Sequence, residues 1–300
     1  MTVLALTGGT GFVGARLIDA ALAAGHQVRA LARRPQPERL GVTWIAGALD
    51  DAPALDRLLA GADAAIHVAG VVNAADRAGF VAGNVEGTRA MLAAAARADV
   101  TRFVHVSSLA AREPGLSDYG WSKAEAERLV AASPLAWTIV RPPGVYGPGD
   151  LEQLELFRMA RRGVVMLPPP GRLSVIAVDD LAALLLAAAT GDGPRTIYEA
   201  DDGTDGWTHA GFARAIGAAV GRRVLPLPLP RALLSLVARG DRLVRGAGAK
   251  LTPDRVAMYC HPDWTVDPAR RPPASLWRPR VATPQGLADT ARWYRANGLL

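Results

Sequence analysis

Short apolar runs alternate along the chain with longer segments in which apolar side chains recur every three or four positions. The runs cover residues 3–6, 26–32, 42–45, 64–68, 102–106 and 136–140. The periodic segments between them cover 12–22, 53–60, 84–98 and 118–132. Short apolar runs are typical of buried parallel strands, and strands that alternate with helices connect by right-handed crossovers. The pattern therefore predicts an α/β fold with a doubly wound parallel sheet.

The alternation changes after residue 145. Proline-rich and glycine-rich connections interrupt the following segments, whereas residues 173–189 return to an apolar strand and helix. We expect one domain made of residues 1–145, with 173–198 returning to it. Residues 146–172 and 199–300 are expected to form a smaller C-terminal lobe that binds substrate.

A glycine-rich turn separates the first strand from the first helix. Gly8, Gly9, Gly11 and Gly14 follow the apolar run 3–6 directly and precede the helical pattern. Glycines allow backbone angles that side chains forbid and let amide groups approach a pyrophosphate, and the start of a helix favours an anion. In this strand-to-helix context the turn predicts a dinucleotide site on a Rossmann-type domain.

Two arginines follow the second strand. An acidic residue about 20 positions past the glycines binds the ribose hydroxyls in an NAD site, whereas arginine suits the 2′-phosphate of NADP. Arg33 and Arg34 stand at this place. The sequence therefore favours NADP as cofactor over NAD.

A tyrosine and a lysine are four residues apart on the helical segment 118–132, so Tyr119 and Lys123 share one face. A phenol is a poor acid or base at neutral pH, and a nearby ammonium lowers its pKa. We expect Lys123 to activate Tyr119 in this way and to hold the cofactor ribose. Ser108, at the end of the strand 102–106, can bond the substrate oxygen.

The chain resembles an extended short-chain dehydrogenase/reductase of the NAD(P)-dependent epimerase/dehydratase family over nearly its whole length. The matching motifs are residues 7–14, 67–70, 84–88, 106–108, Tyr119 with Lys123, and 141–149. The resemblance implies that Ser108, Tyr119 and Lys123 are catalytic, and that Asn84 supports the fold or a proton relay. It also implies that residues 142–145 pack near the nicotinamide.

The resemblance also has two departures. Gly47-Ala48 replaces the usual Gly-Asp, so an adenine contact has to come from the backbone or from Leu49. Ala177 replaces the usual histidine before Val178-Asp179-Asp180, and Asp179 and Asp180 are expected to cap a helix. With the glycine turn and the arginines, the predicted cofactor-binding residues are Gly8, Thr10, Gly11, Phe12, Val13, Gly14, Arg33, Arg34, Leu49, Val68, Ala69, Gly70, Lys123, Pro142 and Val145.

Three functions are compatible with this sequence. The first is an NADP-dependent oxidoreductase that interconverts a secondary alcohol and a ketone on a small, apolar substrate. The second is a nucleotide-sugar epimerase, dehydratase or reductase, with lobe arginines such as Arg158, Arg172, Arg222 and Arg223 on a diphosphate. The third is a sensor that binds NADP without chemistry, against which the intact Ser108, Tyr119 and Lys123 set argues.

The positive charge of the protein is unevenly distributed along the sequence, which bears on the kind of partner that it could bind. The net charge of +6 arises in residues 201–300, which carry +7, while residues 1–200 carry −1. These arginines form no motif that reads nucleic acid, so we expect no nucleic-acid partner. Residues 229–244 carry a leucine stripe with arginines largely off it, which predicts a helix packed on the lobe core. Alternatively, this segment lines an apolar entrance or contacts a membrane surface.

The remaining expectations concern compartment and assembly. A single cysteine, Cys260, excludes an internal disulfide, and no metal-ligand spacing recurs. The chain opens directly into a strand and has no long apolar stretch, so we expect a soluble cytoplasmic protein. A homodimer through paired helices is compatible with the resemblance.

Overall fold

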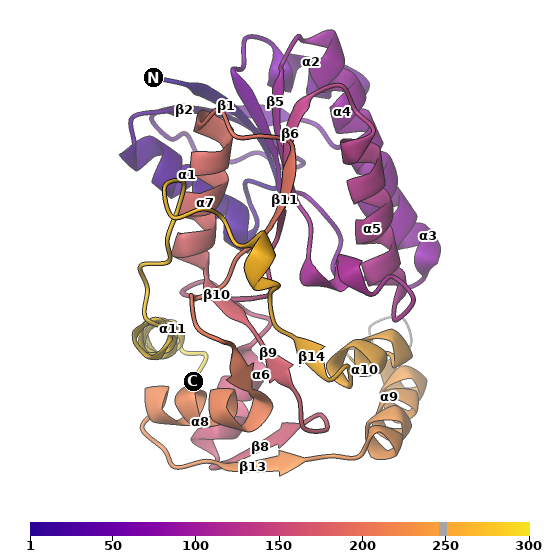
Figure 1. Ribbon diagram of the computed structural model, residues 1–300, viewed down its shortest axis with the longest axis vertical. Helices are drawn as coiled ribbons and strands as arrows, with labels where there is room; N and C mark the ends of the chain where they lie inside the picture. Colours follow the sequence, from indigo (N-terminus) through magenta and orange to yellow (C-terminus); the bar gives the residue numbers. More distant parts are fainter. Residues whose placement is uncertain (246–250) are drawn as a thin grey trace. The chain divides into compact units, whose positions relative to one another are not determined.

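Seven strands form one parallel sheet in the computed structural model, which describes residues 1–245 and 251–300. Across the sheet their order is β11-β6-β5-β4-β1-β2-β3 (Figure 1). The strands are β1 (Val3–Thr7), β2 (Gln27–Ala32), β3 (Val42–Ala46), β4 (Ala64–His67), β5 (Arg102–Val106), β6 (Ala136–Arg141) and β11 (Thr196–Glu199). The strand order reverses between β1 and β4, which is where open α/β sheets bind ligands. The predicted doubly wound α/β fold is confirmed.

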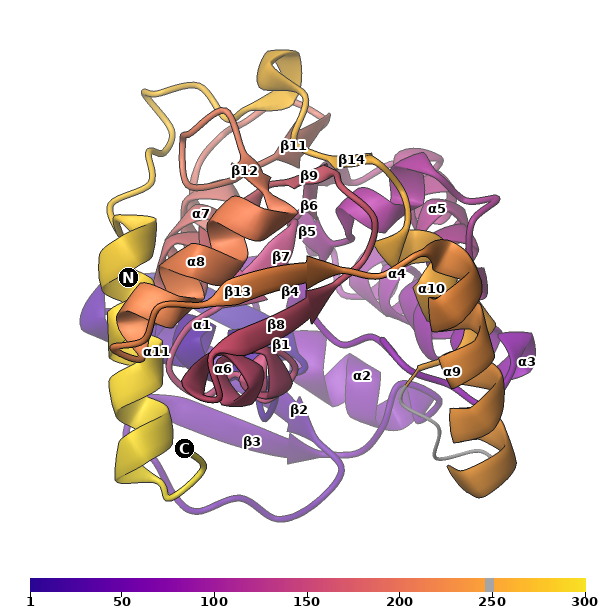
Figure 2. The ribbon, with the colours of Figure 1, turned by 90° about the horizontal axis from the view of Figure 1, so that it is seen from below.

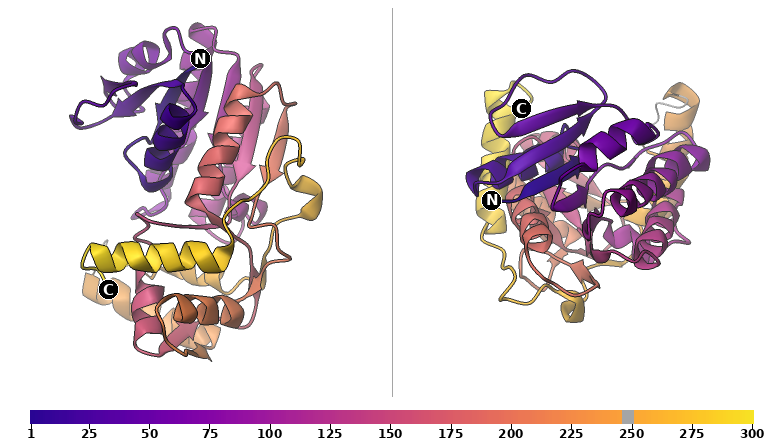
Figure 3. Two further views of the ribbon diagram at one scale, coloured as in Figure 1. Left: turned by 90° about the vertical axis from the view of Figure 1, so that its left-hand side faces the viewer. Right: turned by 90° about the horizontal axis from the view of Figure 1, so that it is seen from above.

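Helices cover both faces of this sheet. One face carries α1 (Phe12–Ala23) and α7 (Val178–Thr190), and the other carries α2 (Ala52–Leu59), α4 (Gly87–Arg97) and α5 (Asp118–Ala131) (Figures 1 and 3). The second face is filled by small and branched side chains: Ala5, Ala65, Phe103 and Ile139 of the strands pack with Leu55, Met91 and Val130 of the helices. This packing fixes the carboxyl ends of the strands, and the turns that follow them.

The chain divides into two compact units, which we describe separately. The first consists of Met1–Pro142, Asp179–Glu199 and Ala269–Arg278, and the second of Pro143–Val178, Ala200–Pro268 and Pro279–Leu300. These bounds differ from the expected division at 143–145, 173–178, 199 and 269–278. The assignment of a cofactor domain and a substrate lobe remains a proposal.

The second unit combines short strands with five helices among the described residues. Its strands are β7 (Gly144–Tyr146), β8 (Val164–Leu167), β9 (Arg172–Leu173), β10 (Val175–Ala177), β12 (Trp207–Thr208), β13 (Leu225–Pro228) and β14 (Asp263–Trp264). Its helices are α6 (Leu154–Arg161), α8 (His209–Ala219), α9 (Arg231–Arg245), α10 (Pro253–Tyr259) and α11 (Thr283–Ala296). Its own core gathers Tyr146, Phe157, Phe212, Ile216 and Tyr294.

Three local expectations require correction. The predicted helix 84–98 is a π-helix over Val81–Glu86 followed by α4, and a short helix α3 (Arg77–Phe80) precedes it. Asp179 and Asp180 lie inside the first turn of α7 and not before it, so neither is the N-cap. Their negative charges instead stabilise the positive end of the helix dipole. The leucine stripe of 229–244 is not packed on a core: Leu233, Leu236 and Val237 are exposed. The side chains of Arg242, Val244 and Arg245 lie outside the described part of the chain.

Candidate active site

The glycine turn brings the ends of β1 and β4 into contact. Gly8 has φ +76°, and a Cβ on it would lie 2.7 Å from the backbone nitrogen of Ala69. A Cβ on Gly14 would lie 2.0 Å from the carbonyl oxygen of Gly8, which also accepts a hydrogen bond from Gly11 N at 3.0 Å. Any side chain at Gly8 or Gly14 would therefore force the strand, the turn and the helix apart.

The start of α1 is open to an anion. Gly11 is its N-cap, no side chain caps the first turn, and the first turn carries no acidic residue. Its N–H groups are thus left to a ligand, which is the arrangement that binds a dinucleotide pyrophosphate. Together with the close approach at Gly8, these residues fit a nicotinamide dinucleotide.

The other predicted cofactor residues surround this turn to different extents. Arg33 and Arg34 follow β2, are exposed, and form no ion pair with a described residue. Leu49 instead packs on Gly87 at the start of α4, where a Cβ would lie 2.6 Å from its Cδ1. Val145 belongs to the second unit, so the structure does not place it beside the turn, whereas Pro142 O accepts from Leu109 N at 3.1 Å in the first unit.

Residues 68–70 rest on a buried polar chain. Ala69 N donates to Thr7 Oγ1 at 3.2 Å, and that hydroxyl donates to His67 Nδ1 at 2.7 Å. His67 Nε2 then donates to Thr88 Oγ1 at 3.2 Å, and Thr88 donates to Asn84 O at 2.7 Å, which assigns the proton of neutral His67 to Nε2. Burial, with a smaller effect of Lys123, lowers the pKa of His67 to about 3. These hydrogen bonds therefore hold the loop of residues 68–70 in place, and His67 stays uncharged.

Asn84 ties the π-helix to the same loop. Its Oδ1 accepts from Val71 N at 2.6 Å, and its Nδ2 donates to Val71 O at 2.9 Å and to Ser122 Oγ at 2.8 Å. Gly70 lies beside this group: a Cβ on it would be 3.0 Å from Asn84 Oδ1 and 3.1 Å from Lys123 Nζ. π-Helical turns are rare and concentrate at functional sites. Asn84 thus positions the loop and α5 together, consistent with a supporting role.

Ser108 and Tyr119 meet through their hydroxyl groups. Ser108 lies two residues after β5 and is the N-cap of a short 3-10 helix (Leu109–Arg112), with its Oγ accepting from Ala110 N at 3.2 Å. Helix α5 begins at Asp118 with Ser117 as N-cap, whose Oγ accepts from Gly120 N at 2.9 Å. Burial raises the pKa of Tyr119, and the hydrogen bond with Ser108 acts in the opposite direction. The expectation that Lys123 lowers the pKa of Tyr119 is therefore wrong for the protein alone. The phenol is neutral and able to donate a proton.

Lys123 is buried beneath the loop. Its Nζ donates to Val106 O at 3.1 Å, and 4% of the residue is exposed. Burial lowers the pKa of Lys123 to about 8, and the Glu127 carboxylate opposes this shift. The ammonium is thus mostly charged at neutral pH and close to titrating.

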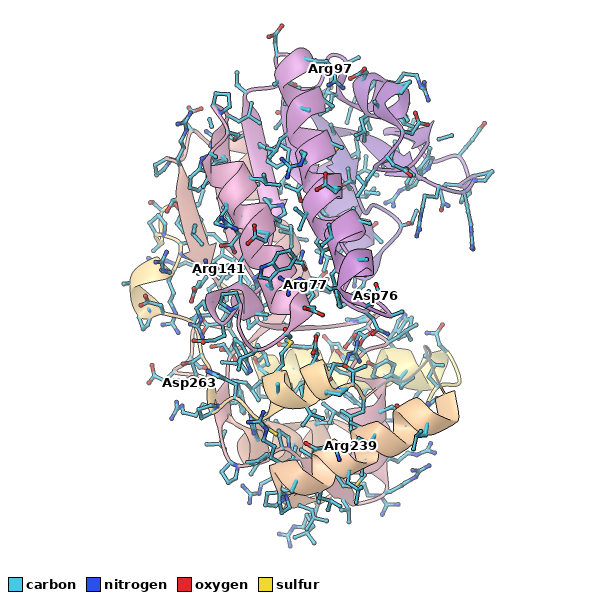
Figure 4. All side chains as sticks on the ribbon, turned by 90° about the vertical axis from the view of Figure 1, so that its right-hand side faces the viewer. Asp76, Arg77, Arg97, Arg141, Arg239 and Asp263 are labelled. Carbon is cyan, nitrogen blue, oxygen red and sulfur yellow. The ribbon has the colours of Figure 1, made fainter. Side chains whose placement is uncertain are left out.

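A buried ion network behind Lys123 was not found from the sequence. Glu127 accepts from Ser107 Oγ at 2.5 Å and from Arg141 (Figure 4), and Arg141 Nη1 donates to Glu199 Oε1 at 3.2 Å. Arg112 Nη1 reaches the other oxygen of Glu199 at 3.2 Å. The sequence does contain a signal for Glu127: it lies four residues after Lys123, as Lys123 lies four residues after Tyr119, so the three side chains share one side of the helix.

Neither a metal-binding cluster nor a membrane-spanning helix is present among the described residues. No group of three or more His, Cys, Asp or Glu side chains gathers there in a way that could hold a metal ion. Within the same residues, no helix has both the length and the apolar character needed to cross a membrane.

The chain is similar to known NAD(P)-dependent enzymes. Residues 8–191 match the family described as NAD(P)H-binding. A ceramide reductase of Caulobacter vibrioides is 38% identical over 311 residues, which cover 99% of this chain and 96% of the relative. Sterol demethylase protein B of Methylococcus capsulatus is 29% identical over 336 residues, covering 100% of both chains.

Solved structures share the fold. MoeE5 in complex with UDP-glucose and NAD superposes with a TM-score of 0.76 at 23% identity, covering 99% of both chains. The gox2253 structure has a TM-score of 0.79 at 24% identity, covering 100% of this chain and 99% of the other. At such identities the likeness concerns the fold. With the family match and the curated relatives, it follows that the chain belongs to the NAD(P)H-binding family, and that it is an NAD(P)-dependent enzyme of the dehydrogenase/reductase type.

Proposed function

We propose that this enzyme is an NADPH-dependent reductase that interconverts a ketone and a secondary alcohol on an apolar, lipid-like substrate. The observation that carries the proposal is the hydroxyl pair of Ser108 and Tyr119 beside the buried Lys123, in the same unit as the glycine turn. Binding a dinucleotide alone requires no such set, which argues against a sensor without chemistry.

The raised pKa of Tyr119 keeps its phenol protonated at neutral pH, which is the form that reduction of a ketone requires. A neutral phenol is an acid, and Ser108 is placed to hold the same substrate oxygen by a hydrogen bond. A bound reduced nicotinamide supplies a hydride to the carbonyl carbon. Tyr119 gives its proton to the carbonyl oxygen, which yields the secondary alcohol and leaves a phenolate. Lys123 lies one helical turn further along α5, and we propose that its ammonium stabilises this phenolate once substrate and cofactor are bound.

The choice of NADPH is supported by the electrostatics of the loop after β2. Arg33 and Arg34 are exposed and have no carboxylate partner in the described chain. A 2′-phosphate would supply the missing negative charge, whereas the hydroxyl of NADH would not.

An apolar substrate is supported by what the lobe arginines do. Arg158 donates to Glu155 Oε1 at 2.7 Å and to Leu299 O at 3.2 Å, and Arg172 donates to Asp205 O at 2.5 Å. These two guanidinium groups are thus engaged within the chain, whereas the other two candidates, Arg222 and Arg223, are exposed and form no ion pair with a described residue. The engagement of Arg158 and Arg172 removes two of the four arginines proposed for a diphosphate. The names of the curated relatives, ceramide reductase and sterol demethylase protein B, refer to lipids.

A substrate panel tests the proposal. NADPH oxidation is followed with long-chain 3-oxo lipids, 3-oxosteroids and UDP-sugars, for the wild type, Tyr119→Phe and the control Tyr198→Phe. We expect oxidation with an apolar ketone, lost in Tyr119→Phe and kept in Tyr198→Phe. Conversion of UDP-sugars instead would favour the second function, and tight NADPH binding without any turnover would favour the sensor.

A further inference from the structure

Strands β8 and β13 form a two-stranded parallel sheet (Figure 2). This sheet has apolar side chains on both of its faces. Val165 and Leu167 point into the core of the second unit. On the opposite face the register pairs Leu225 with Val164 and Leu227 with Met166, and all four side chains are exposed. A sheet with one solvated face normally alternates apolar and polar residues. These two cross-strand pairs are therefore an apolar surface without a partner in the described chain.

Helix α9 begins three residues after β13 ends and also exposes apolar side chains. Leu233, Leu236, Val237 and Leu243 share one side of the helix, and Leu236 is 64% exposed and Leu243 88%. The opposite side carries Ala238, which is fully buried. The helix thus presents its leucines outward, the reverse of a surface helix that packs on a core. We call these four residues and the four sheet residues the outer apolar face.

Arginines border the outer apolar face. Arg161 and Arg162 directly precede the β8 segment, and Arg222 and Arg223 precede β13. Because β8 and β13 are parallel, these four exposed residues gather at one end of the sheet. Arg231 and Arg239 are exposed on α9, and Figure 4 labels Arg239. None of the six forms an ion pair with a described residue, so the surface combines exposed leucines with uncompensated positive charge.

The open edge of β13 is unsuited to pairing with another strand. Leu225 N donates to Gly163 O at 2.9 Å and Leu229 N to Leu167 O at 2.8 Å, both toward β8. Alternation then directs positions 226 and 228 to the open edge, and both are proline, which has no N–H. A partner that adds a strand would find no donors there. A partner would therefore bind to the apolar face of the sheet and not to the open edge of β13.

We propose that the outer apolar face docks on a membrane surface that contains anionic lipids. Leucines enter the boundary of the acyl chains while arginines pair with lipid phosphates, as in interfacial helices. Docking of this kind requires no helix that spans the bilayer. It goes beyond the proposed function, because lipid binding is measured without substrate or cofactor.

Vesicle flotation tests the proposal with the full chain. Vesicles of phosphatidylcholine alone are compared with vesicles that also contain phosphatidylglycerol, at low and high salt. The test variant is Leu225→Ser with Leu236→Ser, which are 63% and 64% exposed. Its control is Leu40→Ser with Leu151→Ser, two leucines elsewhere that are 98% and 62% exposed. A second pair compares Arg222→Gln/Arg223→Gln with Arg214→Gln/Arg295→Gln.

We expect the wild type to float with the anionic vesicles and to be released by salt. The test leucine variant should bind about tenfold more weakly or worse, and the Arg222/Arg223 variant should have a clearly reduced salt dependence, while both controls match the wild type. Unchanged thermal unfolding and NADPH affinity show that each variant is folded. Equal flotation of test and control, or none by the wild type, overturns the proposal. A wild-type dimer that Leu225→Ser/Leu236→Ser makes monomeric, with no flotation, assigns the face to a second copy instead.

Discussion

Glu127 accepts both prongs of the Arg141 guanidinium, with Nε 2.8 Å from Oε1 and Nη2 2.6 Å from Oε2. The two side chains are 7% and 12% exposed. Such a bidentate pair fixes geometry as well as charge. Because Glu127 is on α5 and Arg141 ends β6, the pair fastens the helix that carries Tyr119 and Lys123 to the carboxyl end of the sheet. It also supplies the negative charge that opposes the lowering of the Lys123 pKa.

Replacing Glu127 by glutamine should narrow the pH range of activity. Glu127 raises the pKa of Lys123, so an uncharged amide lets that pKa fall below about 8. The lysine is charged only below its pKa, and the loss of rate on the alkaline side should therefore begin at lower pH in Glu127→Gln. The pH profile of kcat/KM with an identified ketone measures the shift.

Glu125→Gln is the matched control for that experiment. Glu125 lies on the same helix and pairs with Arg128, whose side chain is 72% exposed. Its substitution should leave the alkaline limb in place. If Glu127→Gln also leaves the limb unmoved while kcat/KM falls at all pH values, Glu127 only fastens the helix.

The strand-helix alternation and the glycine turn could be predicted because they depend on local sequence. Apolar period and glycine placement specify β1, the turn at Gly8 and α1 with no information from distant residues. The helix at Asp118–Ala131 was placed within one residue of its end for the same reason. The Arg141 network could not be derived in this way, because Glu127, Arg141 and Glu199 are brought together only by the strand order.

Two further differences have specific physical causes. The π-helix at Val81–Glu86 depends on Asn84 bonding the backbone of Val71, a contact that periodicity does not encode. The stripe on α9 has the correct period but the opposite orientation, since periodicity shows that a helix has an apolar side and not what that side faces. The direction of the Tyr119 pKa shift depends on burial, which a spacing of four residues does not reveal.

Cofactor preference should depend on the two arginines after β2. We expect NADPH to bind about tenfold more tightly than NADH or better, and Arg33→Gln/Arg34→Gln to remove about 1.4 kcal/mol or more of that preference. Titration of both nucleotides against wild type and variant measures it. Arg39→Gln is the control, because Arg39 is exposed on the same loop but pairs with Asp19. Equal affinities in the wild type would refute the NADP assignment.

Removal of the phenol hydroxyl should affect turnover and not cofactor binding. Tyr119→Phe keeps the ring but removes the proton donor, so kcat should fall by about 10²–10⁴ with NADPH affinity nearly unchanged. Lys123→Ala should reduce both, because its ammonium is expected to serve the phenolate and the ribose. Full activity of Tyr119→Phe on an identified substrate would contradict the proposed role.

Two buried histidines should make the protein sensitive to acid. His67 and His105 are stacked with ring centroids 5.5 Å apart, and burial, with added repulsion, lowers the pKa of each below its ordinary value. Between about pH 6.5 and the folded-state pKa, the unfolded chain binds protons that the folded chain excludes, so the free energy of unfolding falls as pH falls, by up to about 1.4 kcal/mol per pH unit for each group. Denaturant unfolding across this range should show a shallower fall in His105→Leu, whose ring nitrogens bond no described residue. An unchanged pH dependence would show that His105 does not contribute.

Alanine substitutions at two glycines, Gly8 and Gly25, distinguish the cost of backbone strain from the cost of a steric clash at the cofactor turn. Gly8 and Gly25 have nearly the same φ, +76° and +78°, but a Cβ on Gly25 meets nothing within 4 Å, whereas on Gly8 it would lie 2.7 Å from Ala69 N. Gly25→Ala should therefore cost only the strain of a left-handed residue, about 1–2 kcal/mol of unfolding free energy, and leave NADPH affinity unchanged. Gly8→Ala should cost more, because the backbone at Ala69 has to move, and should weaken NADPH binding by about tenfold or more. Thermal unfolding and nucleotide titration on both variants measure the two effects. Equal losses in both would mean that the turn tolerates the side chain and that contact between β1 and β4 does not shape the cofactor site.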